Sequence, residues 1–432
     1  MAVYRPDRAL RVATGAVAHD LCAAAFVQQI DPDRVFAESL RPRAGLERIA
    51  GLIRYRVDRA AGLVDVSVSG VAHMRAAHQP GWGCLVLHEP VVAPPAFPAG
   101  PASPPPAPIE PGAARLAAAL DRAFAEDGPG PPRRTKAIVV LRDGQVVAER
   151  YAPGYTAATP LPGFSLAKSL MNALIGAAVA QGRLDPAAPA PVPAWANDAR
   201  RAITLEQLMR MTAGLALDET GSGFDPSNQM LYLARDMAGF AADAALADPP
   251  GTRWNYSSGM TQLAARILRD AVGGTGADML AFAGSALFAP LGITGMTIEM
   301  DATGTPIGAN YVFAPARDWA RLGQLFLDDG MAGGRRLLPP GWVAWSTRPT
   351  LDSDYGAGFW VNASGHAHAR GRVRRGMPED AFFGSGNLGQ RLAILPGQRL
   401  VVARFGYATG EDGDIAGFTR LIADLVAASP SG

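Results

Sequence analysis

The chain has 432 residues, enough for two or three domains with a large hydrophobic core. Its 48% apolar and 18% charged residues are typical of a globular protein. A net charge of +1 offers no electrostatic basis for binding nucleic acid or an anionic membrane. Cys22 and Cys84 are too few for a disulfide scaffold or a cysteine metal site. We expect them to be two buried free thiols rather than one bridge.

The N-terminal segment carries no recognisable targeting or membrane signal. No apolar run reaches the ~18–20 residues needed to cross a bilayer. Charged side chains such as Asp7, Arg8 and Arg11 interrupt any signal-peptide core. We therefore expect no membrane span and a cytoplasmic location, with a periplasmic location left open if a leader has been removed.

A proline-rich stretch, residues 93–112, divides the chain. Prolines at this density cannot supply backbone donors, so we expect an extended linker between an accessory α+β module at 1–92 and a catalytic domain at 113–432. Within 1–92 the patterns predict one helix and three strands, at 9–28, 52–57, 63–69 and 83–90. The four histidines of the module, His19, His73, His78 and His88, are scattered and form no catalytic or metal motif. The module is interpreted as packing or dimerisation surface.

The catalytic region alternates between strand-rich ends and a helical middle. In chain order we expect a helix at 113–126, a hairpin around Asp143-Gly144 at 137–151 and a helix from Ser165 to Gly182. Residues 204–324 should be mostly helical, starting at a Thr204–Gln207 capping box and including helices at 259–272 and 315–328. Strands at 356–361, 390–395 and 399–406 and a helix at 415–428 complete the chain. This order predicts an α+β fold. One antiparallel sheet would be built from both ends and flanked by helices, with a helical subdomain inserted.

A lysine marks the first chemical motif. The chain has only two lysines, Lys136 and Lys168, among 40 basic residues. Arginine stays protonated and cannot act as a base, whereas a buried lysine can lose its proton. Lys168 follows Ser165 by three positions at the start of a predicted helix, so both side chains share a face. Burial and the positive helix end would lower the lysine pKa from ~10.4 toward neutrality.

Other serine hydrolase designs fit poorly. A catalytic triad needs a histidine base, yet none lies between Ser165 and Asp354, and His366 and His368 come only in a later loop. Position 167 is alanine, so the nucleophile elbow G-x-S-x-G is also missing. A serine nucleophile activated by a lysine base is the mechanism that still fits the sequence.

Two further stretches could complete such a site. In "WNYSSGM", Tyr256 on a tight turn could shuttle a proton if a neighbouring cation stabilised its phenolate. In "FFGSGNLGQ", the glycines let the backbone approach a ligand, and the N–H of Asn387 could serve as an oxyanion donor beside that of Ser165. In isolation, each has a plain alternative as a core tyrosine or a glycine bend.

Together, these three elements resemble the serine β-lactamase and penicillin-binding-protein superfamily, where S-x-x-K, Tyr-x-Asn and K-T-G recur. Stretches such as "LEQLMRMTAGL" and "PGTRWNYSSG" are similar to its class C-like esterase and amidase branch, which includes 6-aminohexanoate-dimer hydrolases. The resemblance covers about residues 113–430. It implies a β-lactamase-like fold, Ser165 as the acylated nucleophile, Lys168 and Tyr256 as the proton-transfer pair, and the N–H groups of Ser165 and Asn387 as the oxyanion hole.

The sequence departs from the superfamily pattern at two places. Ser258 replaces the asparagine of Tyr-x-Asn, which makes a shorter contact on the amide side of the substrate. Gly384, Ser385 and Gly386 replace Lys-Thr-Gly, and no lysine follows residue 168. The missing cation argues against anionic β-lactams and cell-wall peptides as substrates.

Three other stretches carry weaker signals. "GHAHARGRVRRG" at 365–376 could hold a metal or a phosphate, but we interpret it as a solvated loop. "GGTG" near residue 275 follows no strand and is not a nucleotide cradle. The polar segment 218–232 could line the cleft, with Asp225 or Tyr232 touching substrate.

The sequence thus predicts a serine hydrolase without metal or other cofactor that cleaves a small-molecule amide or ester through an acyl-enzyme. A short-chain carboxylesterase is the alternative among enzymes. Outside enzymes, a penicillin-binding-like sensor or scaffold would acylate without turnover. We expect no nucleic-acid partner, and a homodimer is the assembly to test.

Overall fold

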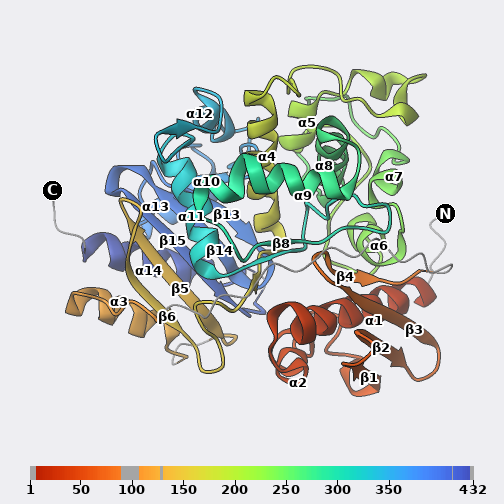
Figure 1. Ribbon diagram of the computed structural model, residues 1–432, viewed down its shortest axis with the longest axis horizontal. Coiled ribbons are helices and arrows are strands. Elements are labelled where there is room, and N and C mark those ends of the chain that lie inside the picture. Colours follow the sequence, from red (N-terminus) through yellow and green to blue (C-terminus); the bar gives the residue numbers. More distant parts are fainter. Residues whose placement is uncertain (1–5, 89–106, 127–129, 411, 429–432) are drawn as a thin grey trace.

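A computed structural model describes residues 6–88, 107–126, 130–410 and 412–428 (Figure 1). The predicted linker therefore lies mostly outside the described residues, and its last part, 107–112, forms neither helix nor strand. We call residues 6–88 the N-terminal module. Its helical elements are α1 (Pro6–Cys22), which runs on as η1 (Ala23–Gln28), and α2 (Pro32–Val35), η2 (Phe36–Leu40) and η3 (Ala50–Leu52).

The N-terminal module is a four-stranded antiparallel sheet covered on one face by α1. The strands β1 (Ile53–Asp58), β2 (Leu63–Val68), β3 (Ala72–Gln79) and β4 (Gly83–Val86) pair in chain order. Alternate residues of β2 are buried, and Val64 and Val66 pack in one core with Val17 and Leu21 of α1. Sequence analysis found β1, β2 and β4 but missed β3, because its alanines, histidines and arginine give little strand propensity.

The prediction of two free thiols is wrong. Cys22 at the end of α1 and Cys84 on β4 form a disulfide, with their Cα atoms 6.1 Å apart. The two cysteines are 62 residues apart in sequence, so only the packing of α1 on the sheet brings them together. The bridge ties the helix to the last strand of the module.

One described helical stretch, Asp7–Gln28, has the length and hydropathy of a membrane span, which the count of consecutive apolar residues did not anticipate. Within its most apolar window 67% of the residues are buried inside the protein. A core helix of a folded domain has the same properties.

The second sheet is built from both ends of the remaining chain, as expected. Its six antiparallel strands run in the order β12 (Trp360–Val361), β13 (Phe382–Gly386), β14 (Gln390–Leu395), β15 (Leu400–Gly406), β5 (Thr135–Arg142) and β6 (Gln145–Tyr151). The join is between β15 and β5, where Val402 pairs with Val140. Residues on both faces of these strands are buried, so the sheet lies between two helical layers.

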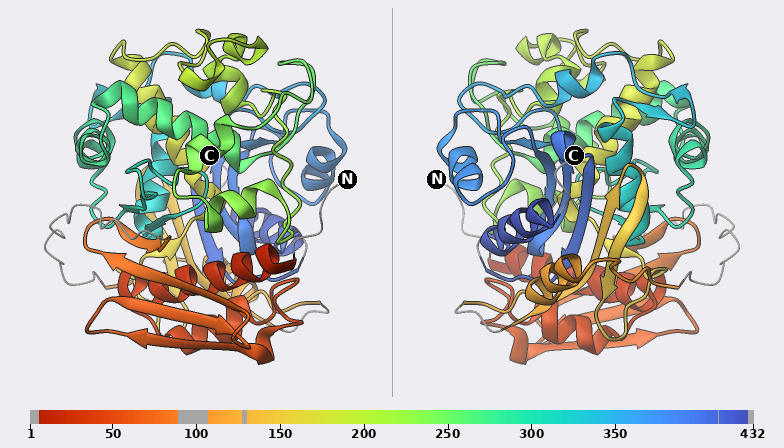
Figure 2. Two further views of the ribbon diagram at one scale, coloured as in Figure 1. Left: turned by 90° about the vertical axis from the view of Figure 1, so that its right-hand side faces the viewer. Right: turned by 90° about the vertical axis from the view of Figure 1, so that its left-hand side faces the viewer.

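The two helical layers differ in size (Figures 1 and 2). On one face, α3 (Ala114–Phe124) and α14 (Ile415–Ala427) pack together, with Phe418 and Leu120 among the buried residues. On the other face, α11 (Ala316–Leu327) contacts β15, β14 and β5. The observed bounds of these three helices agree with the predicted ones to within two residues.

The helical insertion lies between β6 and β12. Its α-helices are α4 (Ala167–Ala180), α5 (Leu205–Met209), α6 (Pro226–Leu233), α7 (Met237–Ala242), α8 (Ser258–Val272), α9 (Gly276–Ala283), α10 (Ala289–Leu291), α11 and α12 (Trp342–Ser346). The short helices between them are η4 (Phe164–Leu166), η5 (Pro193–Trp195), η6 (Ala199–Ala202) and η7 (Gly284–Phe288). The insertion also holds a small sheet of β7 (Leu161–Pro162), β9 (Val312–Ala314) and β8 (Thr297–Ile298), and a hairpin of β10 (Met331–Ala332) and β11 (Arg335–Arg336). The Thr204–Gln207 capping box is present at α5. The last elements are α13 (Ala367–Arg374), η8 (Asn387–Gly389) and η9 (Pro396–Gln398). The region 204–324 is less continuously helical than expected, whereas the helix predicted at 259–272 matches α8.

Candidate active site

Ser165 lies on a strained turn at the start of α4. It is the central residue of η4, and the preceding Phe164 has a φ of +46°, a conformation that a bulky side chain rarely adopts. Gly163 passes so close to Trp319 that a Cβ there would meet a ring carbon at 2.4 Å. Packing therefore holds the backbone before Ser165 in one conformation.

Lys168 is one helical turn further on, and its amine faces Ser165. Its Nζ lies 3.0 Å from Ser165 Oγ, 3.1 Å from Ser258 Oγ and 3.1 Å from the carbonyl oxygen of Ala309. Only 3% of Lys168 is exposed, whereas Ser165 is partly accessible. Ser258 and Ala309 accept hydrogen bonds from the lysine amine and so hold it next to the Ser165 hydroxyl.

Burial lowers the pKa of Lys168 to about 8, although the nearby carboxylate of Glu219 opposes the shift. An appreciable part of the amine is then neutral near physiological pH. A neutral amine 3.0 Å from a hydroxyl can accept its proton. The sequence predicts that burial lowers the pKa of Lys168, and burial is the largest cause of the lowered pKa in the structure.

Tyr256 completes the group. Its phenol interacts electrostatically with the Ser165 side chain, and Lys168 Nζ lies 4.8 Å from the centre of its ring. Burial and the charge of Glu219 raise the pKa of Tyr256 well above its usual value. The raised pKa favours the neutral phenol of Tyr256, which can donate a proton.

Aromatic side chains line one side of this group. The ring of Tyr256 stacks on Trp360 with centroids 5.9 Å apart and meets Tyr355 edge-on at 5.7 Å. Trp254 contacts all three rings. Trp254 and Trp360 are only half-buried, so this aromatic wall offers an apolar surface beside Ser165.

A carboxylate that sequence analysis did not single out lies next to this group. Glu219 accepts the backbone N–H of Ser258 at 2.8 Å and the hydroxyl of Ser227 at 3.1 Å. It falls in the polar segment 218–232, but nothing in the sequence separates it from the neighbouring acids. Ser258, which the sequence predicts to contact the substrate, accepts a hydrogen bond from Lys168.

The strand that carries the glycine motif packs directly against the nucleophile turn. A Cβ at Gly386 would come within 2.1 Å of the Gly163 carbonyl oxygen, so the end of β13 contacts the backbone beside Ser165. This contact brings the exposed Asn387 to the nucleophile end of the sheet. A Cβ at Gly384 would meet Leu166 and Ser169 of the nucleophile segment at 2.8 Å. A side chain at position 384 would require the Leu166 and Ser169 side chains to shift.

Arg391, the nearest cation in sequence to Gly384, is used elsewhere. It pairs with Ser385 across the strands, and its guanidinium lies over the ring of Phe418 on the α14 side of the sheet. Its N–H groups donate to four backbone carbonyls, those of residues 386, 390, 412 and 413. Arg391 therefore does not replace the missing lysine.

Asp225 and Tyr232 serve the fold. Asp225 caps α6 by accepting the N–H of Asn228 at 2.7 Å. The hydroxyl of Tyr232 accepts from Tyr311 at 2.5 Å, and both side chains are buried. Neither has the exposed polar atoms expected of a cleft-lining contact.

The segment predicted to be a solvated loop at 365–376 is largely the helix α13, which is a correction. Arg372 anchors it by donating to Asp354 Oδ2 at 2.8 Å and to Asn362 at 2.8 Å, in a buried setting. The sequence does not predict this helix, because its buried face carries Arg372 where a hydrophobic residue is the usual signal.

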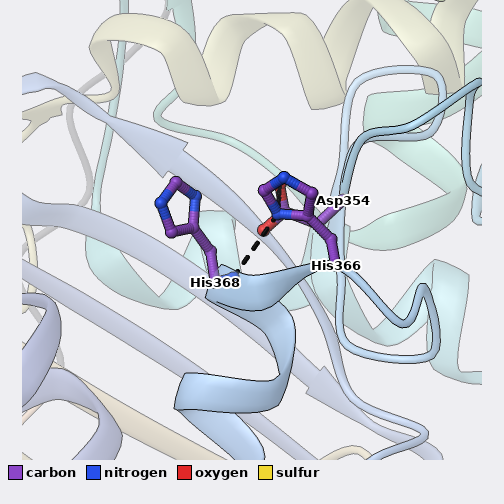
Figure 3. A group of neighbouring side chains, drawn as sticks. All are labelled: Asp354, His366 and His368. Carbon is purple, nitrogen blue, oxygen red and sulfur yellow. Dashed lines mark hydrogen bonds and ion pairs between the residues drawn. The ribbon is translucent and has the colours of Figure 1, made fainter.

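His366, His368 and Asp354 lie together at the start of α13 (Figure 3). His366 Nδ1 is 3.6 Å from Asp354 Oδ1, and it already accepts the backbone N–H of His368 at 3.4 Å. Arg372 neutralises the same carboxylate. The group is satisfied as a helix cap and an ion pair, so we assign it no metal.

Comparisons with known proteins identify the family and the fold of the chain. The beta-lactamase family model matches residues 120–426. A 6-aminohexanoate-dimer hydrolase of Paenarthrobacter ureafaciens is 30% identical over 224 residues, which is 48% of this chain and 56% of that protein. A penicillin-binding-protein homologue from Caulobacter crescentus superposes with a TM-score of 0.59 at 21% identity, covering 74% of this chain and 98% of that one. A family VIII carboxylesterase superposes with a TM-score of 0.56 at 17% identity, over 74% and 98%.

Proposed function

Since the chain belongs to the beta-lactamase family, with the matched residues containing the whole Ser165 site, we propose that it is a serine hydrolase that cleaves an amide or ester through an acyl-enzyme on Ser165. The observation that carries the proposal is the buried amine of Lys168, 3.0 Å from Ser165 Oγ. A serine hydroxyl next to a neutral buried amine is an activated nucleophile.

The reaction follows from the positions of these groups. Neutral Lys168 takes the proton of Ser165 as Oγ attacks the substrate carbonyl carbon, and the carbonyl electrons move to the oxygen. The backbone N–H groups of Ser165 and Asn387 are our candidates for holding that oxyanion. When the carbon–nitrogen or carbon–oxygen bond breaks, the leaving group takes a proton from Tyr256, which regains one from protonated Lys168. Water then attacks the acyl-enzyme, and the reverse proton transfers release the acid.

The surroundings of the site favour acyl groups that need no cationic anchor. Gly384 has no side chain and so no charge to offer, and Arg391 is bound to backbone carbonyls. The aromatic wall of Trp254, Tyr355 and Trp360 offers apolar contact. We propose as substrates esters and amides whose acyl group carries no carboxylate, a class that includes linear ω-amino-acid amides.

The test is covalent labelling. Intact-protein mass spectrometry after reaction with a fluorophosphonate should show one adduct on the wild type and none on Ser165→Ala. Ser285→Ala, at an exposed helix position, is the control and should label fully. A Ser165→Ala protein that still labels at the same rate, or turns over p-nitrophenyl acetate, would contradict the assignment. A burst of labelling without steady turnover by the wild type would instead support the sensor alternative.

A further inference from the structure

The N-terminal module contacts, through α1, the segment 218–233 that carries Glu219. Helix α1 packs on α6, and α6 lies directly above α1 in Figure 1. A Cβ at Gly15 would come 3.1 Å from Cβ of Tyr232. At the other end of the contact, Ala9 lies 3.4 Å from the Cβ position of Gly223. The segment 218–233, which we call the wall segment, therefore contacts the module at Gly223 and at Tyr232.

Buried polar contacts reinforce this support. Tyr311, which donates to Tyr232, stacks on the ring of His19 with centroids 3.6 Å apart. His19 Nε2 lies 2.5 Å from Glu299 Oε2, and the other carboxylate oxygen of Glu299 accepts the backbone N–H of Cys84 at 2.6 Å. Burial alone would lower the pKa of His19, but the carboxylates of Glu299 and Asp20 raise it to about 9. The module thus contacts the catalytic domain through a buried pair of a histidine and a carboxyl group.

From the wall segment, hydrogen bonds lead to the lysine. Ser227, in the first turn of α6, donates to Glu219. Glu219 accepts the N–H of Ser258, whose hydroxyl accepts from Lys168. Each link is at most 3.1 Å long.

We propose that the N-terminal module is a permanent part of the active site, in which α1 fixes the wall segment so that Glu219 is held against Ser258 and beside Lys168. Glu219 is a positioning residue that acts through Ser258 and through its charge. This proposal rests on the role of Lys168 in the proposed function. It gives residues 6–88 a task that the sequence pattern of the module does not suggest.

The charge of Glu219 matters because little else near Lys168 is charged. Around its amine lie the hydroxyls of Ser165 and Ser258, the carbonyl of Ala309 and the ring of Tyr256. Among the described residues, Glu219 is the one charged group that shifts the pKa of Lys168, and it shifts it upward. If α1 releases the wall segment, the pKa of Lys168 should fall further.

The experiment changes the α1–α6 contact without touching the site. Gly15→Leu places a side chain against Tyr232, whereas Gly51→Leu, in the same module, has nothing within 4 Å and is the matched control. Gly15→Ala is a milder version, because alanine favours a helix more than glycine does and α1 itself should not weaken. The first readout is amide hydrogen exchange of residues 218–233 in the full-length protein without substrate. We expect exchange at least ~10-fold faster in Gly15→Leu and unchanged in Gly51→Leu.

The second readout is the pH dependence of kcat/KM on p-nitrophenyl acetate. Both Gly15→Leu and Glu219→Gln should move the acid limb to lower pH, by roughly half a unit or more, since each removes the anion beside Lys168. In the double variant the shift should equal that of Glu219→Gln alone. Shifts that add, or a Gly15→Leu limb at the wild-type pH, would refute the role of Glu219.

The two proposals fail in different ways. If exchange of the wall segment is the same in Gly15→Leu, Gly15→Ala and the control, the module does not support the wall, whatever the enzyme does. If exchange changes as expected but Ser165→Ala keeps its activity, the proposed function fails while the support stands, and the link to Lys168 is refuted with it.

Discussion

Replacing Lys168 by arginine tests the chemistry most directly. Burial lowers the pKa of Lys168 from its usual 10.5 to about 8. A shift of this size raises the neutral fraction at pH 7 by a factor of about 300. Arginine keeps the charge but never becomes neutral at this pH. We expect Lys168→Arg to lose at least ~10²-fold in kcat/KM, about as much as Lys168→Ala.

The wild-type pH profile carries the same information. Activity that needs neutral Lys168 should rise about tenfold from pH 7 to pH 9, with the midpoint near 8. The assay is kcat/KM for p-nitrophenyl acetate, corrected for spontaneous hydrolysis, with folding checked by circular dichroism at each pH. Because protonated Lys168 is the inactive form, the limb must fall on the acid side.

The second lysine of the chain supplies the matched control. Lys136 on β5 is buried and forms a 2.6 Å ion pair with Glu38 of the N-terminal module. Lys136→Arg keeps that charge, so activity should stay within ~2-fold of the wild type once the folded fraction is measured. An active Lys168→Arg, or an acid limb centred near 6.5 as for histidine, would refute the proposed base.

Three other results are expected. Tyr256→Phe should lower kcat by a factor of ~10²–10⁴, the usual loss for a proton-transfer group, and a change below ~5-fold in steady-state rates would place proton donation elsewhere. Nitrocefin and penicillin G should be turned over far less efficiently than p-nitrophenyl esters of short acids, because Gly384 and Arg391 offer no cation to the lactam carboxylate. Such a cation would strengthen binding by ~1.5–3 kcal/mol, or ~10–100-fold. Equal kcat/KM values for the lactams and the esters on one preparation would contradict this. Replacing Cys22 and Cys84 by serine should destabilise the protein by up to about 4 kcal/mol from the loop of 62 residues, measured by urea unfolding, and an unchanged midpoint would show that the bridge adds no stability.

The sequence by itself determined much of the local structure and the motif. Hydrophobic periodicity, the Thr204–Gln207 capping box and the Asp143-Gly144 turn depend on neighbours in sequence, so the helices and the hairpin were predictable. The three-residue spacing of Ser165 and Lys168 on a helix is also local, and the structure brings their side chains together.

Tertiary structure decided everything that depends on residues distant in sequence. Cys22 and Cys84 meet only after α1 packs on the sheet, and Arg391 turns away from Gly384 because β14 alternates its faces. Glu219 is one acid among several until folding sets it on the N–H of Ser258. Burial, which sets the pKa of Lys168 and Tyr256, is a property of the assembled core, and no local pattern specifies it.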